Sequence, residues 1–175
     1  MAHKNLYKAI IDKLRADSSG ADSLVSLTDY STSNYSIARD APIVKERTPF
    51  LGVRINISVP LMGDGATTRL QTAEVELVSH ARSELTALKL ADRLEYLVHE
   101  VQTSETQFYD FSDTNVSNRQ TMFKSREAPY FDDKTDVWSV QVTLDVIWIN
   151  QSCSSETILW QLTPQRLLSE LQQFQ

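Results

Sequence analysis

The sequence has one cysteine, Cys153, among 175 residues, and it has no long apolar run. A single cysteine cannot form an intramolecular disulfide, and it has no second thiolate with which to build a metal site. No stretch approaches the roughly 18–20 apolar residues that cross a bilayer, and the polar start 1–4 lacks the apolar core of a signal peptide. We therefore expect a protein made in a cytoplasm, without a disulfide framework and without a membrane partner.

Positive charge is scarce. The chain has 17 Lys and Arg against 23 Asp and Glu, a formal net charge of -6, and no run rich in Lys or Arg. Affinity for nucleic acid comes largely from cationic neutralisation of the phosphate backbone. Tight binding of DNA or RNA is therefore not expected, although an acidic protein would let DNA pass through a pore without holding it.

Motifs of catalysis and metal binding are missing. His3, His80 and His99 lie far apart, and none has a partner at the His-x-x-x-His spacing. The sequence contains neither a Gly-x-x-x-x-Gly-Lys-Ser/Thr phosphate loop nor a Gly-x-Gly-x-x-Gly fingerprint. The Gly-Asp-Gly at 63–65 is explained by a tight turn between two strands. These observations predict a protein that is not an enzyme and that holds no cofactor and no metal.

The densest acidic cluster consists of Asp132, Asp133 and Asp136. These carboxylates lack the spacing of a calcium loop and flank the start of a predicted strand. A solvated loop is the favoured interpretation over a cation site.

Hydrophobic periodicity predicts two helices and three long strands. Apolar residues step by three or four over 4–16 and again over 83–101, as in amphipathic helices. They alternate with polar residues over 51–61 and 71–77, which predicts an antiparallel hairpin, and over 138–148, which predicts a third strand. The length and the 41% hydrophobic content suit one domain. We predict an α+β fold with an antiparallel sheet of four to five strands, two helices on one face and a short C-terminal helix.

The remaining segments are less regular. The polar stretch 23–40 predicts a loop, and short strands are expected near 108–111 and 120–126. We divide the chain into a domain over 1–150 and an extension over 151–175.

The extension carries a good helix start at Thr163-Pro164, with Thr as N-cap and Pro in the first helical position. It either packs on its own domain or docks as an arm on a neighbouring subunit. The residues of this candidate arm are Trp160, Leu167, Leu168, Leu171 and Phe174.

The polar faces of the strands are the last candidate site. Glu74, Glu76 and Asp145 are predicted to project from the side opposite the apolar rows. They form either the ordinary solvated face of an antiparallel sheet or, if the subunit repeats around a ring, an acidic and hydrated inner wall.

Several segments together resemble the tail-terminator, or tail-completion, proteins of tailed bacteriophages. They are the opening helix LYKAIIDKL at 6–14, the strand PFLGV at 49–53, the helix 87–101 with its Ala-Asp-Arg-Leu centre, and the strand 138–148. The resemblance spans about residues 4–149. The extension after residue 150 and the loop 104–117 depart from it as additions.

The resemblance implies a structural virion protein that works in the tail or neck. Such proteins form a ring, usually a homohexamer, which caps the tail tube, stops its polymerisation and joins the tail to the head, with DNA passing through the centre. The implied partners are further copies of the chain, the tail tube protein, neck or connector proteins and, in a contractile tail, the sheath. The family has no catalytic residue to carry over.

Three other interpretations remain open. The nearest alternative is another neck or tail component of the same particle, such as a head-completion adaptor or a tube-like subunit. A small ligand-binding domain or enzyme would need scattered residues such as His99, Tyr109 and Asp110 to meet in space. A nucleic-acid-binding module would need a cationic face, which the sequence does not indicate.

Overall fold

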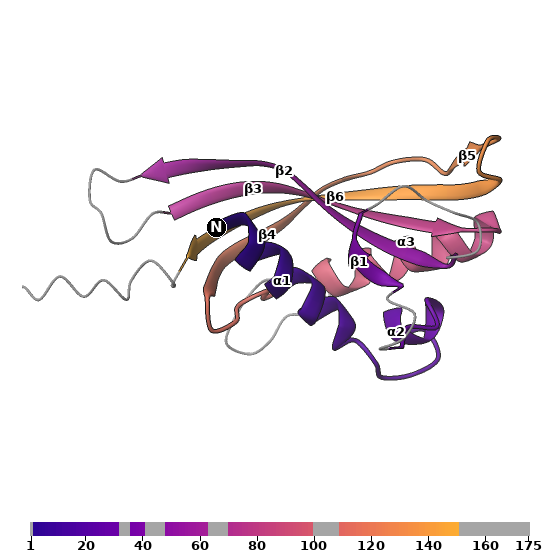
Figure 1. Cartoon of the computed structure of the whole chain (residues 1–175), viewed down its shortest axis with the longest axis horizontal. Coiled ribbons are helices and arrows are strands. Elements are labelled where there is room, and N and C mark those ends of the chain that lie inside the picture. Colours follow the sequence, from indigo (N-terminus) through magenta and orange to yellow (C-terminus); the bar gives the residue numbers. More distant parts are fainter. Residues whose placement is uncertain (1, 32–35, 41–47, 63–69, 100–108, 151–175) are drawn as a thin grey trace, which may run out of the picture.

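The structure is a computed structural model, and it describes residues 2–31, 36–40, 48–62, 70–99 and 109–150. These residues form an α+β fold in which three helices pack on a mixed six-stranded sheet (Figure 1). In chain order the elements are α1 (Ala2–Arg15), α2 (Leu24–Leu27), β1 (Ile37–Arg39), β2 (Phe50–Met62), β3 (Leu70–Ala81), α3 (Glu84–His99), β4 (Val116–Arg126), β5 (Tyr130–Asp132) and β6 (Val137–Asn150).

The strand order is β1-β2-β3-β6-β4, and β5 pairs with β6 beyond the end of β4. The strands β2, β3, β6, β4 and β5 pair antiparallel. The alternating patterns predicted the three long strands β2, β3 and β6, and β4 lies where a short strand was expected near 120–126, whereas β5 was not predicted. The prediction of a purely antiparallel sheet is wrong, because β1 runs parallel to β2 and the sheet has six strands. β1 has only three residues, too few for an alternating pattern, and it lies with α2 in the stretch that was predicted as a loop.

All three helices lie on one side of the sheet, below it in Figure 1. α1 packs over β1 and β2, α3 packs over β3, β6 and β4, and α2 contacts both longer helices. The predicted helices at 4–16 and 83–101 are confirmed, whereas the predicted C-terminal helix and the whole segment 151–175 lie outside the described residues.

The hydrophobic core lies between the helices and the sheet. Its central side chains are Leu6, Ile10, Leu14, Leu51, Val53, Val75, Leu77, Leu90, Leu94, Val140, Val142, Leu144, Val146 and Trp148.

Polar contacts along α1 and just after it join this part of the chain to the sheet and to α3. The Arg15 guanidinium donates to the Ile37 carbonyl oxygen at 2.7 and 3.0 Å, and the Tyr7 hydroxyl accepts from the Ile55 N–H at 2.8 Å. Just after α1, the Asp17 carboxylate accepts two hydrogen bonds from Arg93 of α3, at 2.6 and 3.0 Å. Asp17 also accepts from the Leu24 N–H at 2.8 Å, so one carboxylate holds α2 and α3 together.

We expect Asp17→Ala to lower the free energy of unfolding by about 2–4 kcal/mol, because a mostly buried carboxylate with three donors is removed and Arg93 loses its partner. Chemical denaturation of the two proteins measures the change. The matched control is Asp12→Ala, which breaks the exposed Lys8–Asp12 pair and should cost far less. Equal losses in the two variants would contradict the importance of the Asp17 contact.

Candidate functional site

The sheet face opposite the helices is the first candidate site. No described helix covers this face, which lies uppermost in Figure 1. Glu74 on β3 stands directly opposite Asp145 on β6, and Glu76 follows two residues along β3, so the three predicted carboxylates share this face. Their residue exposure differs, because Glu76 is buried whereas Glu74 and Asp145 are partly exposed.

Lys124 on β4 joins two of these carboxylates into a cluster that crosses three strands. Its ammonium group donates to Glu74 and lies 3.8 Å from an Asp145 carboxylate oxygen. The hydrogen bond from Lys124 lowers the pKa of Glu74, and the same bond raises the pKa of Lys124. The two like charges that face each other across β3 and β6 are therefore bridged by a cation.

Arg54 on β2 forms the second cluster. Its guanidinium donates to Asp40 at 2.5 and 3.1 Å and to Glu76 at 3.0 Å. The Asn56 side-chain amide donates to the other oxygen of Glu76. The hydrogen bond to Asp40 raises the pKa of Arg54. The buried Glu76 thus has a cation and an amide as partners, as a carboxylate removed from water requires.

Asp40 lies directly against the backbone of β2. A Cβ atom added at Gly52 would lie 2.7 Å from Asp40 Oδ1 and 3.1 Å from Asp40 Cβ. Glycine is needed at this position because the carboxylate occupies the space of a side chain.

His80 completes the polar layer at the far end of β3. Its Nδ1 lies 2.7 Å from the Ser139 hydroxyl, its ring stacks on Phe50, and its Nε2 lies 3.7 Å from Asp40 Oδ1. Burial lowers the pKa of His80 to about 4, an effect larger than the opposing attraction of Asp40. His80 is therefore neutral at pH 7 and forms no ion pair with Asp40 there.

The sequence indicated the three acidic residues but not the cations that bind them. Arg54 occupies a polar position of an alternating strand, and Lys124 lies in the short strand expected near 120–126, and in both places a cation is an ordinary surface residue. Asp40 carried no signal at all, because it belongs to a stretch without periodicity. The face is a layer in which each of these carboxylates contacts Arg54 or Lys124.

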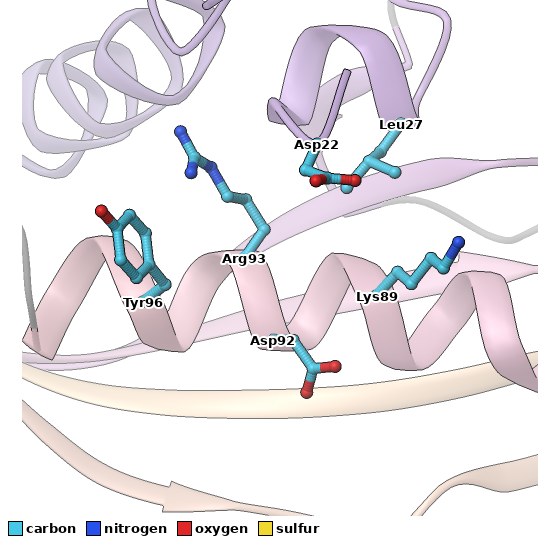
Figure 2. Close-up of a pocket in the computed structure, with 6 residues that line it drawn as sticks. All are labelled: Asp22, Leu27, Lys89, Asp92, Arg93 and Tyr96. Carbon is cyan, nitrogen blue, oxygen red and sulfur yellow. The ribbon is translucent and has the colours of Figure 1, made fainter. Parts of the chain in front are cut away.

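A groove of about 280 Å³ between α2 and α3 is the second candidate site (Figure 2). Asp22 and Leu27 line it from the α2 side, and the remaining lining residues come from α3. Arg93 extends from α3 away from Asp22 and Leu27 and is bound by Asp17, which follows α1, and Tyr96 is 43% exposed beside it. The lining mixes both charges. The α3 residues are Lys89, Asp92, Arg93 and Tyr96.

A second hollow, of about 360 Å³, is lined by Asp92, Glu95, Tyr96 and His99. Arg126 of β4 donates to Asp92 at 2.6 Å and to Glu95 at 3.1 Å, so both carboxylates have a cation as partner. Within the described ranges, no group of three or more His, Cys, Asp and Glu side chains is placed to hold a metal ion.

The contacts of His99, Tyr109 and Asp110 do not join these residues into the alternative site that the sequence suggested. Tyr109 is buried with its ring edge-on to Phe111, and burial raises its pKa. The Asp110 carboxylate accepts from the Ser112 N–H, and the His99 ring lies 4.7 Å from that of Phe123. Each of the three residues has a separate local partner, and Phe108, the start of the expected short strand there, lies outside the described residues.

No protein-family model matches the sequence, and no curated protein matches it either. None of the helices in the described part of the chain is both long and apolar enough to span a membrane.

We expect the stability that depends on His80 to be present above pH 6.5 and to be lost as the pH falls toward 4. The reason is that the unfolded chain binds a proton at the ordinary pKa of about 6.5, whereas the folded protein does so only near 4. Urea denaturation at pH 7.5 and 4.5 should show wild type losing about 2–3 kcal/mol more than His80→Gln. His99→Gln, on the exposed end of α3, is the control and should behave as wild type. Identical pH dependence of wild type and His80→Gln would refute this assignment.

We expect Gly52→Ala to destabilise the fold by about 1–3 kcal/mol, because the new methyl group displaces Asp40 from Arg54. Asp40→Ala removes the carboxylate, which is the nearest obstacle, together with the ion pair, and leaves the Cβ atom at 3.1 Å, so Gly52→Ala should cost less in that background. A double-mutant cycle of unfolding free energies measures this coupling. Additive effects would show that the two residues do not compete for the same space.

Proposed function

We propose that this protein is a structural subunit that assembles into a ring, of the kind that tail-terminator proteins of tailed bacteriophages form. In this role six copies cap the tail tube, stop its polymerisation and contact the neck, and DNA passes through the centre. The proposal is one of structural assembly and not of catalysis, and it places the protein in the virion.

The observation that carries the proposal is the one-sided fold. All described helices cover one face of the sheet, and the other face presents a polar layer in which carboxylates alternate with Arg54 and Lys124. Turned toward the centre of a ring, this face would make a hydrated wall of mixed charge. Its cations are already bound by carboxylates, so they offer little affinity for phosphate, and DNA would pass without being held. The helices would lie on the outside.

A second candidate is a small ligand-binding domain that uses the groove between α2 and α3. The exposed Tyr96 ring and the Lys89 ammonium favour an aromatic or anionic ligand there. Against this candidate, the groove is shallow, and Arg93 is already bound to Asp17. Another neck component, such as an adaptor or a tube-like subunit, would also assemble. A tube-like subunit would polymerise without limit, whereas a terminator stops at one ring.

Light scattering of the purified protein, alone and after mixing with tail tube protein, tests the proposal. We expect either a closed particle of about six 19.9 kDa chains or a monomer that caps tubes and shortens them. Unlimited filaments would favour a tube-like subunit. The second candidate would be favoured instead if the protein is a stable monomer that does not bind tubes and if a small anionic or aromatic molecule stabilises it against heat.

A further inference from the structure

The outer face of α3 exposes apolar side chains. Of the four large apolar residues that are exposed in the described part of the chain, Leu85 and Tyr96 both belong to α3, and they are 64% and 43% exposed. The 11 positions from one to the other make about three turns of helix, so the two side chains lie along one line of α3. Lys89 and Asp92 fall on the same line between them. We call these four residues the outer stripe.

Hollows lie on both sides of Tyr96. Around the axis of α3, Arg93 is on one side of Tyr96 and Glu95 is on the other. Arg93 lines the groove between α2 and α3 (Figure 2), and Glu95 lines the hollow of about 360 Å³. Asp92 and Tyr96 line both. Helices pack when the ridges of one enter the grooves of the other, so a ridge between two hollows suits a second helix.

The sequence predicts such a helix within the 25 residues that follow β6. It begins at Thr163-Pro164, and its apolar stripe consists of Leu167, Leu168, Leu171 and Phe174. A helix of this length is only marginally stable alone in water, so it needs a surface that covers the stripe. From 164 to 174 it is about 15 Å long, and the outer stripe from Leu85 to Tyr96 is about 16 Å long. The two lengths match.

The chain can reach this surface in the same copy. β6 and α3 run in the same direction, from right to left in Figure 1. The centre of the His99 ring, at the end of α3, lies 4.7 Å from that of Phe123, which pairs with Leu144 of β6. The rest of β6 carries the chain about 20 Å past the end of α3. Residues 151–162 span up to about 40 Å when extended, which is enough to turn back to that end.

Charges favour one direction for the docked helix. Arg166 and Glu170 flank its apolar stripe on one side. If the helix is antiparallel to α3, as a chain that turns back would be, Arg166 lies near Asp92. Glu170 then lies near Lys89, whereas the parallel direction brings like charges together in both pairs. Asp92 also binds Arg126, and its side chain is still 62% exposed.

From the matching length, the reach of the chain and the order of the charges, we infer that the predicted helix 163–174 docks antiparallel on the outer stripe of α3 in its own copy. This contact is made within one chain, so it stands apart from the ring in the proposed function. It also covers the groove between α2 and α3, which the second candidate function needs open.

Hydrogen exchange of the full-length protein, followed by mass spectrometry, tests the inference. We expect the amides of 163–174 to exchange about ten-fold or more slowly than in an unfolded chain. Leu85→Ser with Tyr96→Ser should remove this protection, because the apolar contacts are lost, while α1 and β3 keep theirs. Both side chains are exposed, so the two substitutions spare the core.

The matched control is Met122→Ser with Tyr130→Ser, the other two exposed apolar side chains, which lie on β4 and β5. It should keep the protection of 163–174. The inference is wrong if these amides are unprotected in wild type, if the α3 variant keeps the protection, or if the control loses it. It is also wrong if the protection disappears on dilution, because the helix then docks on another copy. None of these outcomes depends on tube binding or ring size, so failure here leaves the ring proposal as it stands.

A charge reversal tests the direction of the docked helix. Lys89→Glu should speed the exchange of 163–174 about two- to five-fold, because Glu170 then faces a like charge. Adding Glu170→Lys should restore the wild-type rate. If exchange stays fast in the double variant, the helix does not lie antiparallel on α3.

Discussion

The antiparallel pairing of β3 with β6 is the constraint on which the rest of this structure depends. Its continuous register from Leu70↔Ile149 to Ala81↔Trp138 places Val75 beside Leu144 and Leu77 beside Val142 under the helices. The same register sets Glu74 against Asp145 on the opposite face. A slip of one residue would exchange the two faces, burying the charges and exposing the core.

The register also creates an electrostatic problem, because two carboxylates directly opposite each other repel. Lys124 of β4 compensates both charges. An irregularity in β4 between Phe123 and Ser125 accompanies the placement of Lys124 across Glu74 and Asp145. On the other side of β3, Arg54 of β2 binds Glu76, the next carboxylate along that strand. The uncovered face is thus polar without being strongly acidic. Because its cations are already bound by carboxylates, this face is poorly suited to binding phosphate.

The sequence by itself determined the elements that are long enough to show a period. α1, α3 and the strands β2, β3 and β6 were all predicted from spacing alone, because a buried stripe on a helix and a buried row on a strand repeat many times. It also determined that Glu74, Glu76 and Asp145 share a face. Tertiary structure alone decided the parallel strand β1, whose three residues pair only because β2 and α1 hold them. It also decided the polar contacts of Asp40, Arg54 and Lys124, because each of these residues is distant in sequence from the carboxylate or glycine that it contacts. Periodicity reports which way a side chain points, whereas the identity of its neighbour across a sheet is set by strand order and register, which no local pattern contains.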